Sequence, residues 1–184
     1  MLAAVHCVLF AGQWMIIRGI WFYPAWDPYV VWHTAQQLAE GVAFPHLDYF
    51  SFIPHNVVLP MLLSIPYRLG MKLGLAEPHV MLLLCSAASI NLTCFLTTLC
   101  LRRLTGSWRV TLWGAGLLTV FILLSPFSAI AYSDAFSILF PVLALLIYLS
   151  ALRTPIKWFW GTVVSGVGAT IKPTVFIFWI AVVL

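Results

Sequence analysis

Charge is what this sequence has least of. Charged side chains make up 8% of its 184 residues, nine of them basic and five acidic, whereas soluble domains carry about 25%. The net charge of +4 is small and gives no reason to expect a nucleic-acid partner. The alternating segments of roughly ten residues that mark a transmembrane barrel are also missing. These absences argue against a soluble globular domain and against a barrel.

The few cysteines show no recognisable chemistry either. Cys7, Cys85, Cys94 and Cys100 all lie within apolar runs, without the spacing of metal ligands. We interpret them as buried thiols that pack as small hydrophobic residues.

Apolar runs dominate what is present. The chain is 63% hydrophobic, and its mean hydropathy is +1.05. Repeated apolar runs near 20 residues predict an all-α fold, a polytopic transmembrane bundle in one domain over residues 1–184. Because the last run stops without a polar flank, we expect this domain to be the N-terminal part of a longer protein. Small residues predict close helix packing near the end of the chain, at Gly161, Ser165, Gly166 and Gly168.

Residues 21–56 form the one long segment that is unsuited to lipid. Asp27 suits the N-cap of a helix, Pro28 its first position and Gly41 its end. With apolar side chains on one face, residues 28–40 are predicted to form an amphipathic interfacial helix in an external loop. The loop holds three of the five acidic residues and three of the five histidines, namely Asp27, Glu40, Asp48, His33, His46 and His55.

Basic residues predict the orientation of the helices. If residues 57–73 are interfacial or re-entrant and do not cross, five basic residues between 102 and 157 fall inside and all acidic residues fall outside. Asp27, Asp48, Asp134 and Lys172 then share the external face. Lys172 is the exception to the charge rule and requires an anionic partner. Three partners for Lys172 remain open: a lipid phosphate, ordinary lipid headgroups, or an acidic residue of the outer loop.

Four stretches resemble the GT-C superfamily of integral membrane glycosyltransferases, which use polyprenyl-phosphate sugars. The resemblance is to bacterial relatives of protein O-mannosyltransferases and aminoarabinose transferases. It covers nearly the whole chain, although each motif is short. The stretches are WDPYVVWHTAQQLAEG, DYFSFIPHNVVLPMLLSIPYRLG, AYSDAFSILF and GVGATIKPTVFI.

The resemblance implies roles for individual residues. Asp27 matches the loop carboxylate that deprotonates the acceptor or helps to hold a divalent metal. Lys172, together with Arg68 or Lys72, would neutralise the phosphate of the leaving lipid. Because Pro28 follows Asp27 where relatives often have a second acidic residue, a two-carboxylate metal site would need Asp48 to fold back.

Simpler roles remain open for the same residues. Asp27 and Asp134 are also interpreted as helix caps. Asp48, His46 and His55 are candidates for binding the sugar or a metal, or for ordinary polar contacts within the loop.

The expected function is therefore sugar transfer from a polyprenyl-phosphate donor to an acceptor at the outer face of a bacterial plasma membrane. The mechanism would be inverting, and the partners are the donor lipid and the bilayer. Two alternatives remain: a transporter or flippase for a lipid-linked or anionic substrate, and an inactive truncated fragment. A transporter commonly shows repeated halves, and the sequence has no internal repeat, which favours the enzyme.

Overall fold

Every regular element in the part of the chain that the structure describes is a helix. The computed structural model describes residues 2–20, 25–44, 46–120 and 129–184, and the predicted all-α class is confirmed for them. The sequence also predicts an aromatic anchor at Trp21, Phe22, Tyr23 and Trp26 and an apolar span over residues 110–127. Residues 21–23 of this anchor and 121–127 of this span lie outside the described part. The helices are α1 (Leu2–Ile20), α2 (Trp26–Ala39), α3 (Leu47–Phe52), the 3₁₀ turn η1 (Pro54–Asn56), α4 (Val58–Lys72), α5 (Val80–Thr105), α6 (Trp108–Leu118), α7 (Ser133–Ser137), α8 (Leu139–Tyr148), α9 (Thr154–Ile171) and α10 (Thr174–Val183).

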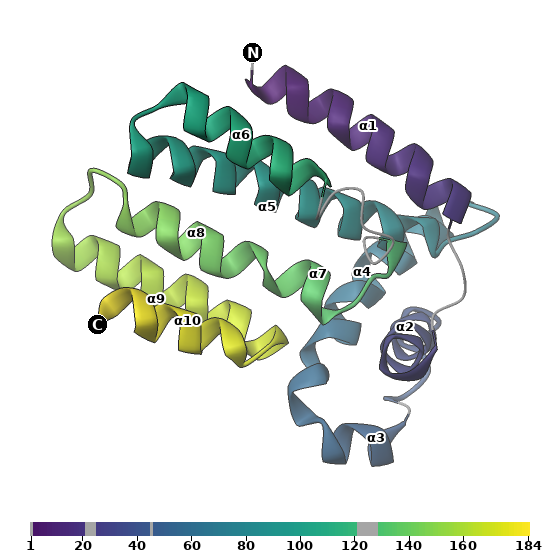
Figure 1. Ribbon diagram of the computed structural model, residues 1–184. Coiled ribbons are helices and arrows are strands. Elements are labelled where there is room, and N and C mark those ends of the chain that lie inside the picture. The colour runs from purple at the N-terminus through teal and green to yellow at the C-terminus, as the bar shows by residue number, and fades with distance from the viewer. Residues whose placement is uncertain (1, 21–24, 45, 121–128) are drawn as a thin grey trace.

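The long helix α5 organises the bundle. It contacts α1, α6 and α8, while α9 packs between α8 and α10, and these helices lie side by side in Figure 1. Ser89 donates a hydrogen bond to the carbonyl of Ala135, and Arg103 donates one to the carbonyl of Leu146. The donors come in the order Ser89, Arg103 along α5, and their acceptors come in the same order, Ala135 then Leu146. The segment α7–α8 therefore runs in the same direction as α5.

The segment between α1 and α5 leaves and re-enters the bundle at the same end. An ion pair joins Arg18, near the end of α1, to Glu77, just before α5, with 3.6 Å between Nη1 and Oε2. Helices α2, α3 and α4 gather at this end, and α4 runs across the bundle instead of along it (Figure 1).

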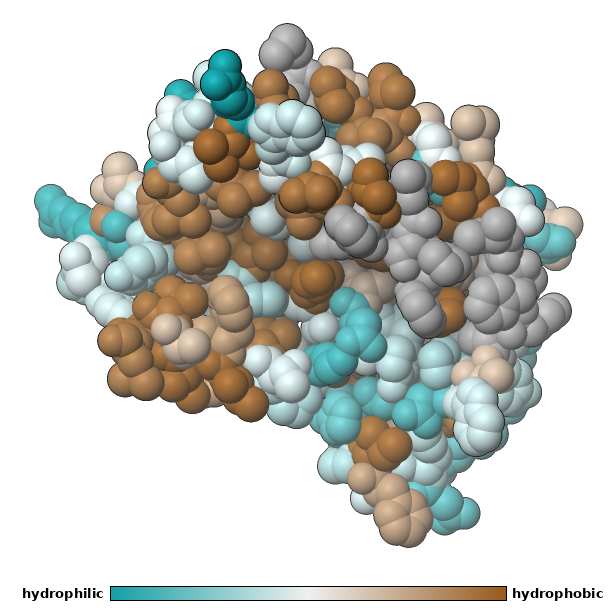
Figure 2. All heavy atoms as spheres, viewed as in Figure 1, coloured by the Kyte–Doolittle hydropathy of each residue, from teal (hydrophilic) through white to brown (hydrophobic). Residues whose placement is uncertain are grey.

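The two ends of the bundle differ in charge. At the end opposite Glu77, Arg102 lies over the ring of Trp108, 4.9 Å from its centroid. The turn between α8 and α9 lies at this end, because Arg103 bonds to Leu146 near the end of α8. The basic residues gathered here are Arg102, Arg103, Arg109, Arg153 and Lys157. Figure 2 shows apolar side chains covering most of the bundle, with hydrophilic ones concentrated where α2, α3 and α4 lie.

The structure supports a membrane-spanning role for one helix only. Among the described helices, Val80–Thr105 alone is long and apolar enough to cross a membrane, and other apolar helices are shorter. The predicted polytopic bundle is thus not established. The apolar run over residues 135–152, which by its length predicts one span, is divided between α7 and α8. Pro141 lacks the N–H that would bond to the carbonyl of Ser137, where the division falls.

The predicted interfacial helix is shifted and packs against protein. It begins at Trp26, its N-cap is Ala25, and no side chain caps it, so the prediction of Asp27 as N-cap was wrong. Asp27 lies instead in the first turn, where a negative charge favours the helix dipole. Gly41 has a φ of +87° just beyond the helix, as its predicted role at the helix end requires. The apolar face of α2 packs against α4, through buried Val31, Ala35, Ala39, Leu59, Leu63 and Tyr67.

Candidate functional site

A buried asparagine lies at the centre of the polar end of the bundle. Asn56, only 1% exposed, donates through Nδ2 to the hydroxyl oxygens of Tyr49 at 2.9 Å and Tyr132 at 3.2 Å. Tyr49 comes from α3, and Tyr132 immediately precedes α7. Each hydroxyl accepts from the amide, and the hydroxyls of Tyr49 and Tyr132 also share a hydrogen bond, which uses the proton of one of them. The arrangement places two hydroxyl groups side by side and leaves one proton for donation to another group.

The same amide has unused hydrogen-bonding capacity. Asn56 Oδ1 is buried and has no hydrogen-bond partner among the residues that the structure describes. A buried acceptor without a partner costs roughly 1–3 kcal/mol, and most such groups in folded proteins are paired with protein or water. Asn56 Oδ1 is therefore suited to accept a hydrogen bond from a bound hydroxyl group or a water molecule.

Tyr49 remains protonated in this environment. The pKa of its hydroxyl is raised to about 12, mainly by burial and also by the neighbouring Tyr132 and Asp27, although the hydrogen bond from Asn56 acts in the opposite direction. Tyr49 is thus a neutral hydrogen-bond donor at physiological pH, not a base.

Asp27 contributes a carboxylate near the tyrosine cluster. Its side chain is half-buried and close enough to Tyr49 for its charge to affect the pKa of that hydroxyl. No hydrogen bond or ion pair joins Asp27 to another residue of the described ranges. An unpaired carboxylate beside two hydroxyl groups has the chemistry of a proton acceptor.

Lys172 and Asp134 form an ion pair beside this cluster. Lys172 Nζ, at the end of α9, contacts Asp134 Oδ1 in the first turn of α7. Tyr132 lies two residues before Asp134 in the chain, so the pair adjoins the tyrosine cluster. The N-cap of α7 is Tyr132, with no side-chain cap bond, so the interpretation of Asp134 as a cap was wrong.

An open groove extends from the ion pair. It has a volume of about 260 Å³ and runs between α7, α8 and α10. Lys172 and Asp134 lie on its wall, and the remainder is mainly apolar, with Ile138, Val175 and Phe178 among its lining residues. A phosphate carrying a hydrocarbon chain matches this combination of a cation and an apolar groove.

Arg68 is held elsewhere. Its Nη2 donates to the carbonyl of Leu38 at the end of α2, at 2.8 Å, and it lies ten residues beyond the start of α4, or about 15 Å along that helix. The structure therefore does not bring Arg68 to Lys172, which corrects the expectation that both would act on one phosphate.

The remaining loop candidates are next to the cluster in the chain but take no part in its hydrogen bonds among the described residues. His46 Nε2 lies 3.1 Å from His33 Nδ1, so these two histidines pair with each other. Asp48 and His55 are exposed. Among the described residues, no group of three or more His, Cys, Asp or Glu side chains is arranged to hold a metal ion.

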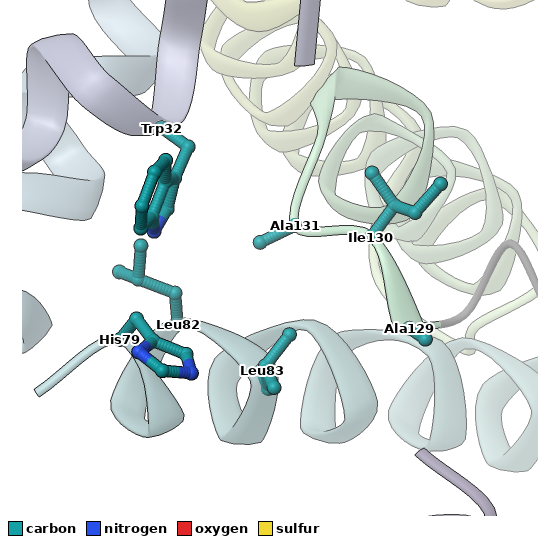
Figure 3. Close-up of a pocket in the computed structure, with 7 residues that line it drawn as sticks. All are labelled: Trp32, His79, Leu82, Leu83, Ala129, Ile130 and Ala131. Atoms are coloured by element: carbon teal, nitrogen blue, oxygen red, sulfur yellow. The ribbon is translucent and has the colours of Figure 1, made fainter. Parts of the chain in front are cut away.

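A second cavity is too small for a substrate. It lies between α2, the start of α5 and residues 129–131, and Trp32 and His79 face it together with Leu82 (Figure 3). Its volume of about 10 Å³ is room for one water molecule. The remaining lining residues are Leu83, Ala129, Ile130 and Ala131.

Sequence reasoning missed Tyr49, Asn56 and Tyr132. All three lie inside stretches that carried the family resemblance, next to residues that were singled out. Their signal is tertiary, because the hydrogen bond from Asn56 to Tyr132 spans 76 residues, and no local pattern predicts that contact.

Comparison with known proteins gives no relative of this chain. No protein-family model matches it, and neither a curated protein nor a solved structure is similar to it.

Proposed function

We propose that this chain takes part in sugar transfer from a polyprenyl-phosphate donor to an acceptor hydroxyl at the outer face of a bacterial plasma membrane, as a glycosyltransferase of the GT-C kind. The observation that carries the proposal is that Asp27 and Lys172 lie at the same end of an apolar helical bundle. Asp27 is close to Tyr49, and Asp134, the partner of Lys172, lies two residues after Tyr132. The hydrogen bonds of the buried asparagine join the two tyrosines.

The proposed chemistry assigns one task to each group. The acceptor oxygen attacks the anomeric carbon with inversion as the bond to the lipid phosphate breaks, and Asp27 takes the acceptor proton. Lys172 stabilises the negative charge on the departing phosphate. Because an ammonium group has three donors, Lys172 can contact a phosphate while Asp134 holds it in position.

The tyrosine cluster would position the acceptor. The hydroxyl pair of Tyr49 and Tyr132 can donate its remaining proton to a sugar or acceptor oxygen, and Asn56 Oδ1 can accept from a hydroxyl group. The groove beside Lys172 would take the first part of the polyprenyl chain. Each group then has one use in holding or transferring the sugar.

The direct test replaces Asp27 with Asn in the full chain and measures transfer from labelled polyprenyl-phosphate sugars in membranes. Transfer should fall on the order of 10²- to 10⁴-fold while donor binding is kept, because a general base contributes about this much. Asp48→Asn makes the same change on an exposed carboxylate and should have little effect. Unaltered transfer by Asp27→Asn would remove this residue from the mechanism.

A further inference from the structure

We propose that the exposed stripe of α4 binds the headgroup of an anionic membrane phospholipid, with Arg68 and Lys72 holding its phosphate. This site is separate from the proposed donor site at Lys172, and the inference does not depend on the proposed function. The stripe consists of Met61, Ile65, Arg68, Leu69 and Lys72, which share one side of α4 because they recur at helical spacing.

The apolar part of the stripe is exposed. Met61 is 53% exposed, Ile65 66% and Leu69 47%, although the opposite face of α4 is buried against α2. Apolar side chains have a lower free energy in contact with hydrocarbon than in contact with water. The stripe therefore requires an apolar partner over part of its length.

The cationic part follows directly on the same face. Arg68 and Lys72 are four residues apart, so their side chains are neighbours on the helix, and both line an open groove of about 320 Å³ together with Ser64, Ile65 and Leu69. No salt bridge joins Arg68 or Lys72 to an acidic residue among those that the structure describes. Two unneutralised cations beside one groove attract an anion.

Arg68 is already positioned for this task. Its Nη2 is bonded to the carbonyl of Leu38, which fixes the guanidinium and leaves its other donors available. A phosphate oxygen bonded to Arg68 and Lys72 would make charge-assisted hydrogen bonds, the strongest class in proteins.

The position of α4 identifies the ligand as a lipid. The helix crosses the polar end of the bundle (Figure 1), at the end where Arg18 and Glu77 pair. A helix face that combines apolar side chains with adjacent cations is typical of binding to anionic lipid surfaces. A free phosphate would use the cations but leave Met61, Ile65 and Leu69 in water.

Photo-crosslinking tests the site in the full chain in detergent micelles. The probe is phosphatidylglycerol with a photoactivatable group in its acyl chain, and labelled peptides are mapped by mass spectrometry. We expect labelling of α4 that unlabelled phosphatidylglycerol competes away and that phosphatidylcholine or inorganic phosphate does not. The variant Arg68→Gln with Lys72→Gln should bind roughly 30-fold more weakly, since each cation near an anionic surface contributes about 1 kcal/mol.

Two controls make the result decisive. The charge-preserving variant Arg68→Lys with Lys72→Arg should retain most of the labelling. Arg109→Gln with Arg153→Gln removes the same charge at the other end of the bundle and should leave the α4 label unchanged. The proposal is overturned if α4 is not labelled, if the double glutamine variant is labelled as strongly as the parent, or if inorganic phosphate displaces the probe. Circular dichroism of each variant establishes that it remains helical.

Discussion

Lys172 and Asp134 lie 38 residues apart in the sequence and form an ion pair at the polar end of the bundle. The side chain of Lys172 is 32% exposed and that of Asp134 68%, so water screens their attraction. An exposed pair of this kind contributes about 0–1 kcal/mol to stability. The pair therefore adds little to holding α7 and α9 together, and the proposed function uses it to position Lys172 for an anion.

The first prediction concerns Lys172, whose ion pair contributes little to stability. Lys172→Met should change the free energy of unfolding by less than about 1 kcal/mol. It should raise the KM for a polyprenyl-phosphate donor by roughly 10- to 100-fold, because a hydrogen bond to a charged group is worth about 1.5–3 kcal/mol. Donor titrations in membranes measure the KM, and Lys157→Met is the matched control at the other end. An unchanged donor KM would eliminate Lys172 as the phosphate contact.

The second prediction concerns the contact between Asn56 and Tyr132. Asn56→Ala should destabilise the chain by roughly 1–3 kcal/mol, because two hydroxyls lose their shared donor. Combined with Tyr132→Phe, the two changes should be non-additive by about 1 kcal/mol, measured by denaturant unfolding. Asn56→Ala with Tyr29→Phe is the control, since no hydrogen bond joins those two residues. Additivity in both pairs would contradict the contact.

The third prediction is a dependence of stability on pH through His79. Burial lowers the pKa of His79 below its ordinary value of 6.5, and Arg18 lowers it further, against the opposing effect of Glu77. As the pH falls below 6.5, the unfolded state therefore binds the proton more readily than the folded state, and stability is lost. Above 6.5 the effect is absent.

His79→Gln should therefore lose less thermal stability on acidification than the parent chain. Melting temperatures at about pH 7.5 and about pH 5.5, on either side of the ordinary histidine pKa, provide the measurement. Equal losses in the two chains would show that His79 protonates as easily in the folded state as in the unfolded one.

The fourth prediction compares two glycines of α9. A Cβ on Gly161 would lie 2.1 Å from Cη2 of Trp179 in α10, whereas a Cβ on Gly166 would meet nothing within 4 Å. Gly161→Ala should thus destabilise the chain, since overpacking costs about 1–3 kcal/mol. Gly166→Ala should be neutral or stabilising by up to about 1 kcal/mol, because alanine favours helix. Thermal unfolding of the two variants tests this, and equal melting temperatures would contradict the close packing.

These glycines also show where sequence reasoning was precise and where it was not. The small residues of α9 were predicted to allow close packing, and Gly161, Ser165 and Gly168 do lie buried on the contact face. Gly166 does not, because the direction in which a helix faces its neighbour depends on where that neighbour packs. The start of α2 was misjudged for a related reason, since Asp27 and Pro28 suit several positions in a first turn.

The sequence by itself determined the helical class, the scarcity of charge and the collection of acidic groups in one part of the chain. These properties are local or compositional, and they follow from apolar runs and helix periodicity. Only the tertiary structure decided that Asn56 joins Tyr49 to Tyr132, that Lys172 meets Asp134, and that Arg68 lies on a different surface. Such contacts join residues that are distant in the chain, so they depend on how the helices pack and not on the pattern within any one of them.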